Sequence, residues 1–272
     1  MKKLAISNIA WPLSEDKNVA SVLKEYGVSG IEIAPTKVWQ NPIDVPEREV
    51  NEYKKFWEQR GFQIVAFQAV LFGHPELTIF ENQTTRDATI AYLTKIIHLA
   101  KKLGAQVLVF GSPKNRLIGN LAKDEVEKIS RGFFSRIGSI ASENGVYLCI
   151  EPNPKEYNSD FITNGHDAVE LVKMVGSPGF GLHLDTACMT LSGDDVEAVI
   201  SQGAPYMKHF HVSEPYLGQV GNGGVDLPRF TSALKKVDYP HWISIEMKEQ
   251  NSPFDIESIR QAVESVKKLF DR

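Results

Sequence analysis

Four residues that can bind a metal ion or transfer a proton lie in the second half of the chain: Glu151, Asp185, His211 and Glu246. Each lies near the end of a short apolar run of strand length. Three carboxylates in one low-dielectric cavity would repel one another and take up protons unless a cation lay between them. Because carboxylate oxygens and one imidazole suit Mn²⁺, Mg²⁺, Co²⁺ or Zn²⁺, the residue types predict one divalent metal ion as cofactor.

Side-chain alternation turns these residues toward one side, because successive side chains of a strand point to opposite faces. In the run 147–153, Leu148 and Ile150 are placed on the outer face, which turns Glu151 inward. The same alternation in the next three runs turns a polar set inward: His183, Asp185, His209, His211, Ser213, Ser244 and Glu246. A single inward carboxylate often caps a helix or pairs with a cation, but four polar positions at matched depth favour a shared site.

These runs belong to a pattern in which strand-like and helix-like segments alternate eight times. The predicted strands cover residues 3–9, 30–35, 63–71, 106–111, 147–153, 180–186, 208–213 and 242–248. The predicted helices cover residues 16–26, 46–60, 84–103, 123–144, 165–175, 194–202, 227–237 and 256–270. Five helix patterns are followed by a glycine that suits a left-handed helix end: Gly27, Gly61, Gly104, Gly145 and Gly176.

Eight such units in 272 residues predict an α/β fold, a single (β/α)8 TIM barrel over residues 1–272. The alternative, an open doubly wound sheet, would carry a Gly-x-Gly-x-x-Gly turn after its first strand, which residues 7–12 do not resemble. In a barrel, active sites form at the C-terminal strand ends, so the four residues are expected to converge there. Glu151 and Glu246 would lie roughly 14 Å apart along the wall, at ~4.8 Å per strand.

Composition narrows the classes of partner. The chain is 42% hydrophobic and 24% charged, which is typical of globular proteins, and its formal net charge of −4 disfavours nucleic acid as a partner. The apolar stretches are too short for a membrane helix. Two cysteines, Cys149 and Cys188, are too few for a disulfide framework and favour a reducing compartment. We therefore expect a cytoplasmic protein that binds neither nucleic acid nor membranes.

Four motifs carry a resemblance to a known superfamily: Ile150-Glu151-Pro152-Asn153, His183-Leu184-Asp185-Thr186, His211-Val212-Ser213-Glu214 and Ser244-Ile245-Glu246. They resemble the motifs of the xylose-isomerase-like sugar isomerases and epimerases, and most of all those of the ketose 3-epimerases. The resemblance extends over the barrel through residues 30–33 and 221–226. It implies a metal held by Glu151, Asp185, His211 and Glu246, with the two glutamates doubling as acid and base. It also implies a small sugar or sugar derivative as substrate, and a homodimer or homotetramer.

The residues fit that chemistry on physical grounds as well. A C–H beside a carbonyl is a weak acid, so its removal needs a carboxylate in contact and a cation near the developing enediolate oxygens. If one glutamate takes the proton and the other returns one to the opposite face, the sugar is epimerised. Return of the proton to the neighbouring carbon interconverts an aldose and a ketose.

Three other functions share part of this pattern. An inosose-type dehydratase would begin with the same proton abstraction and then lose a leaving group. A sugar-binding barrel without catalysis would not require two carboxylates so placed. An apurinic endonuclease of the same superfamily would need further histidines where this chain has Cys188, and the net charge of −4 also disfavours DNA.

Two departures from the resembling ketose 3-epimerases bear on the substrate. Those enzymes carry a histidine and an arginine where this chain has Cys188 and Leu217, which argues against a simple free ketohexose. His183 either replaces that histidine or is a buried structural residue. Glu32 either accepts a sugar hydroxyl or neutralises an interior Lys or Arg.

Loop residues complete the candidates for substrate binding. Lys114 and Arg116, after the fourth strand, either hold a phosphate or carboxylate or are solvated loop charges. Trp11, Trp39 and Phe72 either cover a sugar ring or pack against the protein. Residues 221–224, Gly-Asn-Gly-Gly, are interpreted as a flexible turn.

Overall fold

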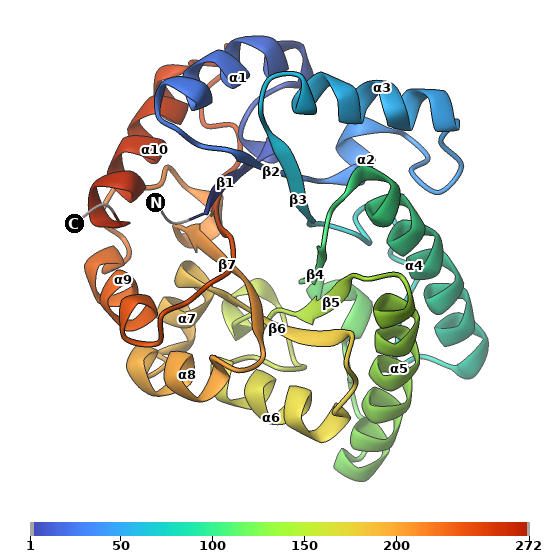
Figure 1. Cartoon of the computed structure of the whole chain (residues 1–272). Helices are drawn as coiled ribbons and strands as arrows, with labels where there is room; N and C mark the ends of the chain where they lie inside the picture. The colour runs from blue at the N-terminus through green and yellow to red at the C-terminus, as the bar shows by residue number, and fades with distance from the viewer. Residues whose placement is uncertain (1–2, 271–272) are drawn as a thin grey trace.

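Parallel strands close into a barrel in the order β1 to β8, with β8 paired to β1. The structure, a computed structural model, describes residues 3–270. The helices form an outer ring around the strands (Figure 1). The strands are β1 (Leu4–Ser7), β2 (Gly30–Ile33), β3 (Gln63–Phe67), β4 (Val107–Phe110), β5 (Tyr147–Ile150), β6 (Phe180–Asp185), β7 (Met207–Ser213) and β8 (Ile243–Glu246). The predicted (β/α)8 barrel is confirmed.

The helices follow the strands in sequence. They are α1 (Asp16–Glu25), α2 (Pro35–Val38), α3 (Glu47–Glu58), α4 (Gln83–Leu103), α5 (Lys123–Glu143), α6 (Gly165–Val175), α7 (Thr186–Ser192), α8 (Val196–Gly203), α9 (Leu227–Lys236) and α10 (Glu257–Phe270). Short 3-10 turns lie at η1 (Asn8–Ala10), η2 (Leu13–Glu15), η3 (Pro113–Arg116), η4 (Lys155–Tyr157) and η5 (Pro215–Leu217). Within residues 3–270, each helix is too short or too polar to cross a lipid bilayer.

The ends of several elements differ from the prediction. β3 stops at Phe67 rather than at residue 71, because the chain turns at Ala69, whose φ is +52°. The helix α7 was not predicted, because its seven residues are too few to show a helical period. Its first turn is capped by Asp185, whose Oδ1 accepts a 2.7 Å hydrogen bond from the Cys188 main-chain N–H. The five predicted glycine helix ends are confirmed by a positive φ at each.

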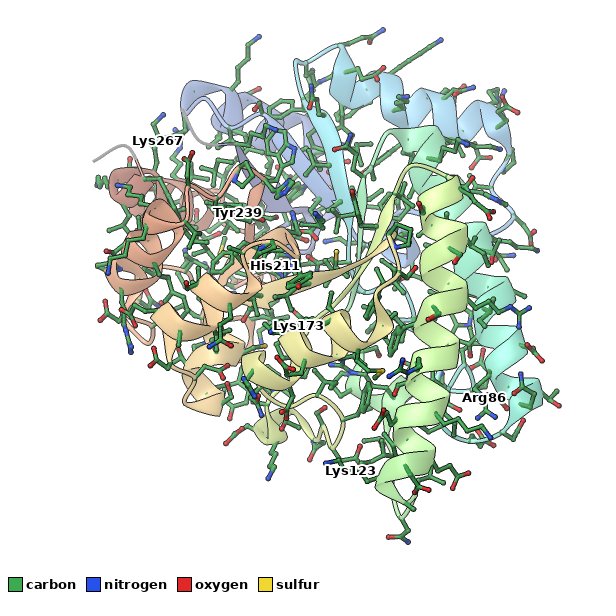
Figure 2. All side chains as sticks on the ribbon, turned by 60° about the horizontal axis from the view of Figure 1, so that its bottom comes forward. Arg86, Lys123, Lys173, His211, Tyr239 and Lys267 are labelled. Atoms are coloured by element: carbon green, nitrogen blue, oxygen red, sulfur yellow. The ribbon has the colours of Figure 1, made fainter. Side chains whose placement is uncertain are left out.

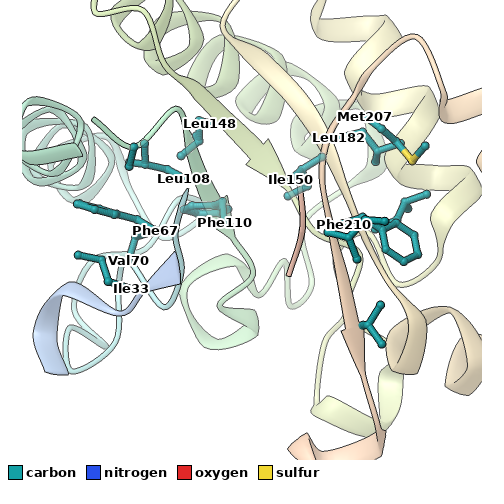
Figure 3. Close-up of a cluster of buried hydrophobic side chains, with 14 of the residues drawn as sticks. Ile33, Phe67, Val70, Leu108, Phe110, Leu148, Ile150, Leu182, Met207 and Phe210 are labelled. Atoms are coloured by element: carbon teal, nitrogen blue, oxygen red, sulfur yellow. The ribbon is translucent and has the colours of Figure 1, made fainter. Parts of the chain in front are cut away.

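Two groups of apolar side chains confirm the predicted alternation. The larger group packs between strands and helices and includes Leu148, Ile150 and Leu182 (Figure 3). A separate, smaller group includes Val109 and Cys149. Because Leu148 and Cys149 are neighbours in sequence and belong to different groups, the wall of the barrel separates the two. Residues with the parity of Cys149 therefore face the inside of the barrel.

Candidate active site

The strand ends bring the four predicted ligands to one mouth of the barrel. Asp185 on β6 and His211 on β7 are register partners, Glu246 ends β8, and Glu151 directly follows β5. One ligand atom of each residue lies within 4.8 Å of those of the other three. The ligand atoms of Glu151 and Glu246 are therefore much closer together than the roughly 14 Å between their positions along the wall, at ~4.8 Å per strand, because the two side chains converge inward. Figure 2 shows His211 inside the ring of helices.

The cluster concentrates negative charge in a buried place. Asp185 is 1% exposed and Glu151 is 8% exposed. Burial, and after it the Glu246 and Glu151 carboxylates, raise the pKa of Asp185 to about 7. Burial also raises the pKa of Glu151, although His211 opposes it. A divalent cation among these oxygens would stabilise their ionised forms, so the donor set fits such an ion.

His211 directs its two ring nitrogens to different partners. Nε2 lies 2.9 Å from Glu32 Oε2, whereas Nδ1 lies 3.2 Å from Glu246 Oε2. Nδ1 is buried and has no hydrogen-bond partner among residues 3–270. When Nε2 carries the proton and donates it to Glu32, the lone pair of Nδ1 faces the cluster. This is the arrangement of a metal-binding histidine oriented by a supporting carboxylate.

Glu32 contacts neither a Lys or Arg nor the cavity, which were the two alternatives that the sequence left open for it. Its carboxylate is fully buried and meets imidazoles rather than a Lys, an Arg or the cavity: His211 Nε2 at 2.9 Å and His209 Nε2 at 3.3 Å. Burial alone would raise the pKa of Glu32, but His211 and His209 lower it well below its ordinary value. The expected interior cation partner is therefore corrected to a pair of histidines.

Each glutamate turns one carboxylate oxygen toward buried imidazoles and the other toward a side-chain amide. Glu246 Oε2 faces His211, while Oε1 accepts a 2.7 Å hydrogen bond from the side-chain amide of Gln68. Glu151 Oε1 lies 3.3 Å from His183 Nε2 and 3.9 Å from His211 Nδ1, while Oε2 accepts a 3.1 Å hydrogen bond from the Asn153 amide. In both residues an amide orients the oxygen that does not face the imidazoles. The role of Gln68 was missed, because in sequence it only interrupts an apolar run.

A cavity of about 610 Å³ opens beside the cluster and is lined by both glutamates and Gln68. This volume lies within the ~300–1,000 Å³ typical of small-molecule sites. Lys37 and Lys248 also line it and were not predicted, since neither belongs to a motif. The remaining lining is mostly apolar and includes Ile9, Ala34, Ala69, Phe72, Val109 and Leu217.

Other predicted substrate residues do not line this cavity as the structure describes it over residues 3–270. Trp11 is fully buried in the core and donates its indole N–H to Asp16, so it packs rather than covering a sugar. Lys114 is exposed. Arg116 is fully buried, so it is not a solvated loop charge, and its Nη2 donates a 2.6 Å hydrogen bond to the Glu151 main-chain oxygen.

His183 is also buried inside the barrel. Its Nε2 lies 3.3 Å from Glu151 Oε1, and its ring centroid lies 4.1 Å from that of His211. Burial, followed by His211 and His209, lowers the pKa of His183 well below its ordinary value. A neutral imidazole packed beneath the ligands matches the structural interpretation of this residue rather than the substrate-binding one.

The glycine-rich turn lies against Glu214, and its interpretation as a flexible turn stays a prediction. The main-chain amides of Gly221, Gly223 and Gly224 lie around the buried carboxylate of Glu214. A Cβ on Gly224 would lie 2.5 Å from Glu214 Oε2, so the turn is wrapped closely around that carboxylate. Burial raises the pKa of Glu214, and the amides oppose the rise.

Replacing Gly111 by Ala is expected to displace Glu151, because the new Cβ would overlap Glu151 Oε2. Metal affinity, measured by calorimetry, should fall by roughly 10-fold or more, as is usual when a ligand is misplaced. Gly132→Ala on α5 is the matched control, since its Cβ would meet no atom within 4 Å. Equal metal affinity in both variants would contradict the close approach of Glu151 to Gly111.

Replacing Glu32 by Gln is expected to weaken metal binding by roughly 10-fold to 100-fold, because a neutral amide supports the His211 tautomer less well than a carboxylate. The exposed Glu125→Gln variant supplies the control, and the absorption spectrum of bound Co²⁺ reports the ligand geometry. An unchanged affinity and spectrum would show that Glu32 does not orient His211.

Comparison with known proteins identifies the family of the chain. A family model described as "Xylose isomerase-like TIM barrel" matches residues 20–269. A ketose 3-epimerase of Arthrobacter globiformis is 27% identical over 110 residues, which is 40% of this chain and 38% of that protein. The chain thus aligns with well under half of the length of that relative. A probable ketose 3-epimerase of Synechocystis sp. is 22% identical over 252 residues, or 90% of this chain and 83% of the relative.

A solved structure shows the same fold. The crystal structure of an IolI protein with bound zinc superposes with a TM-score of 0.77 at 20% identity, covering 99% of this chain and 98% of that one. Because the family model spans nearly the whole described barrel, the chain belongs to the xylose isomerase-like TIM-barrel family.

Proposed function

We propose that this protein is a divalent-metal-dependent epimerase of sugars or sugar derivatives that transfers a proton at the carbon beside a carbonyl. One observation carries the proposal: Glu151 and Glu246 each turn one oxygen toward His211 and have the other oriented by an amide, and both line one cavity. A protein that only binds a sugar would not need two carboxylates oriented in this way. The ketose 3-epimerase relatives support the same class of reaction.

The reaction begins with substrate between the two glutamates. The carboxylate of one glutamate removes the proton from the carbon beside the carbonyl, and the C–H electron pair moves to form a C=C bond while the carbonyl oxygen becomes an enediolate oxygen. The other glutamate, protonated beforehand, gives its proton to the opposite face of the same carbon, and the carbonyl forms again. The first glutamate ends protonated and the second ionised, and exchange with water restores the starting state.

Glu151, Asp185, His211 and Glu246 would hold the divalent ion, which when bound supplies positive charge near the oxygen that becomes negative. The amides of Gln68 and Asn153 keep the remaining oxygen of each glutamate oriented, so that proton transfer starts from a fixed geometry. Glu32 holds the His211 ring in place. The mostly apolar lining of the cavity lowers the local dielectric constant, which strengthens these interactions.

Replacing either glutamate by Gln should abolish the proposed acid–base role. We expect Glu246→Gln and Glu151→Gln to lose about 100-fold to 10,000-fold in the rate of epimer formation while remaining folded, because an amide neither accepts nor donates the reacting proton. Proton exchange from candidate ketoses in D₂O, followed by NMR, measures the rate and identifies an epimer, an aldose or a dehydrated product.

The two variants are compared at saturating metal, with binding verified by calorimetry, since both residues are also ligands. Glu156→Gln, at an exposed position after β5, is the matched control. A metal-loaded Glu246→Gln protein that forms product at the wild-type rate would exclude this mechanism.

Removal and return of metal should change the free energy of unfolding. After treatment with EDTA, adding Mn²⁺, Mg²⁺, Co²⁺ or Zn²⁺ at 100 times its dissociation constant is expected to stabilise the protein by about 2.7 kcal/mol, because the ion binds the folded state alone. Thermal unfolding measures the shift, and Asp185→Asn should reduce it. Identical unfolding curves with and without all four ions would rule out the metal site.

A further inference from the structure

A charged side chain is buried next to the main chain of Glu151. Arg116 is the last residue of the 3-10 turn η3, it is fully buried, and its Nη2 donates a 2.6 Å hydrogen bond to the Glu151 main-chain oxygen. Its Nε and Nη1 are also buried and have no hydrogen-bond partner within residues 3–270. Because burying N–H groups of a charged side chain without partners costs free energy, this arginine calls for an explanation beyond packing.

The guanidinium is close enough to the Glu151 side chain for their charges to interact. Burial lowers the pKa of Arg116 to about 10, and the charge of Glu151, followed by that of Cys188, opposes the change. Arg116 therefore stays protonated at neutral pH. It does not line the cavity that residues 3–270 form beside the cluster. Arg116 thus contacts the proposed acid–base residue, and a substrate in the cavity does not touch it.

The Glu151 carbonyl lies where strand pairing ends. Ile150, the last residue of β5, is paired with Phe110 on one side and with Leu182 on the other. The Glu151 main-chain N–H still donates a 3.3 Å hydrogen bond to the Phe110 oxygen. Since the pairing with β6 stops at Ile150, Arg116 supplies a donor to the Glu151 carbonyl where the sheet does not. Both main-chain polar groups of Glu151 are held in this way.

Arg116 is itself fixed by hydrogen bonds on both sides of its position in the chain. Before it, the side-chain amide of Asn115 donates a 2.8 Å hydrogen bond to the Leu77 main-chain oxygen. After it, the Ile118 main-chain N–H donates a 2.9 Å hydrogen bond to Asp160. These bonds connect the segment to the loops that follow β3 and β5. The guanidinium therefore holds Glu151 from a fixed position.

We propose that Arg116 is a positioning residue, which holds the main chain of Glu151 and thereby keeps its carboxylate in the geometry for proton transfer. This inference rests on the proposed function for the role of Glu151. It replaces the sequence-based expectation that Arg116 contacts a phosphate or carboxylate of the substrate. Because Glu246 is oriented by Gln68 instead, loss of Arg116 should impair one glutamate and leave the other in place.

Proton exchange in D₂O separates the two glutamates. In the proposed reaction each of two epimers presents its C–H to a different glutamate, which takes the proton, exchanges it with solvent and can return a deuteron to the same face. Exchange with retention of configuration therefore reports the glutamate on that face. The probes are a ketohexose, a ketopentose and a ketohexose phosphate, each with its epimer. Metal-loaded Glu151→Gln and Glu246→Gln identify which epimer each glutamate serves, because each variant should lose retention exchange in one epimer.

Two variants of Arg116 then test its role. Arg116→Met removes the charge and the donors at similar volume, whereas Arg116→Lys keeps a charge and a donor. We expect Arg116→Met to lose roughly 10-fold to 100-fold in kcat for retention exchange of the epimer that Glu151 serves, and less than about threefold for the other epimer. Arg116→Lys should recover part of the loss. KM should change less than kcat, because Arg116 does not line the cavity.

A second readout needs no sugar. The dissociation constant and the absorption spectrum of bound Co²⁺ report the placement of Glu151, and Arg116→Met should alter the spectrum and weaken binding by roughly 10-fold. Arg60→Met is the matched control, because the Arg60 guanidinium also donates to a main-chain oxygen, that of Phe56, at 2.7 Å. This control should leave both epimers and the Co²⁺ spectrum unchanged. Circular dichroism verifies folding, and Arg116→Lys carries the test if Arg116→Met does not fold.

The outcomes separate this inference from the proposed function. An equal loss in both epimers, or a loss in the epimer that Glu246 serves, would overturn the positioning role, since it would indicate general damage to the barrel. An Arg116→Met protein with unchanged exchange and an unchanged Co²⁺ spectrum would overturn it as well. If the wild-type protein exchanges protons with none of the probes, that result counts against the proposed function, and the Co²⁺ measurements then decide whether Arg116 positions Glu151.

Discussion

Three carboxylates, of which Glu151 and Asp185 are buried and Glu246 is half-buried, cannot all stay ionised side by side without positive charge among them, and the rest of the site is arranged around this requirement. Burial and the two neighbouring glutamates raise the pKa of Asp185 to about 7. The imidazole of the four-residue cluster, His211, turns Nδ1 toward the carboxylates and Nε2 toward Glu32. A divalent ion held by these residues would satisfy both conditions, because it would supply the missing positive charge and accept the Nδ1 lone pair.

Residues from different parts of the barrel orient the members of the cluster. Asp185 belongs to the four-residue cluster and also caps α7 through Oδ1, so its orientation is fixed by the start of a helix. Gln68 and Asn153 each orient one glutamate, and Gly111 leaves the space that Glu151 occupies. Under the proposed function, this support would hold both glutamates in a fixed geometry for proton transfer. The cavity beside them is lined by both glutamates and Gln68 and otherwise mostly by apolar residues.

The fold was predictable because its signals are local and repeated. Alternating apolar runs and glycine helix ends such as Gly104 and Gly176 depend on residues that are close in sequence. The convergence of Glu151, Asp185, His211 and Glu246 was predictable for the same reason, because strand parity and depth place these residues together once the barrel closes. The end of β3 and the helix α7 were not predictable, since a single left-handed residue at Ala69 and a seven-residue helix leave no periodic pattern.

By itself, therefore, the amino-acid sequence determined the barrel and the residues at its mouth, since both follow from periodicities of two and 3.6 residues. Only the tertiary structure decided which residues support or line the site. Glu32 reaches His211 across 179 residues of sequence and Gln68 reaches Glu246 across 178, while Trp11 and Arg116, which looked like loop residues, are fully buried. Such contacts depend on the closure of the sheet and on side-chain packing, which place distant residues together without leaving a local pattern in the chain.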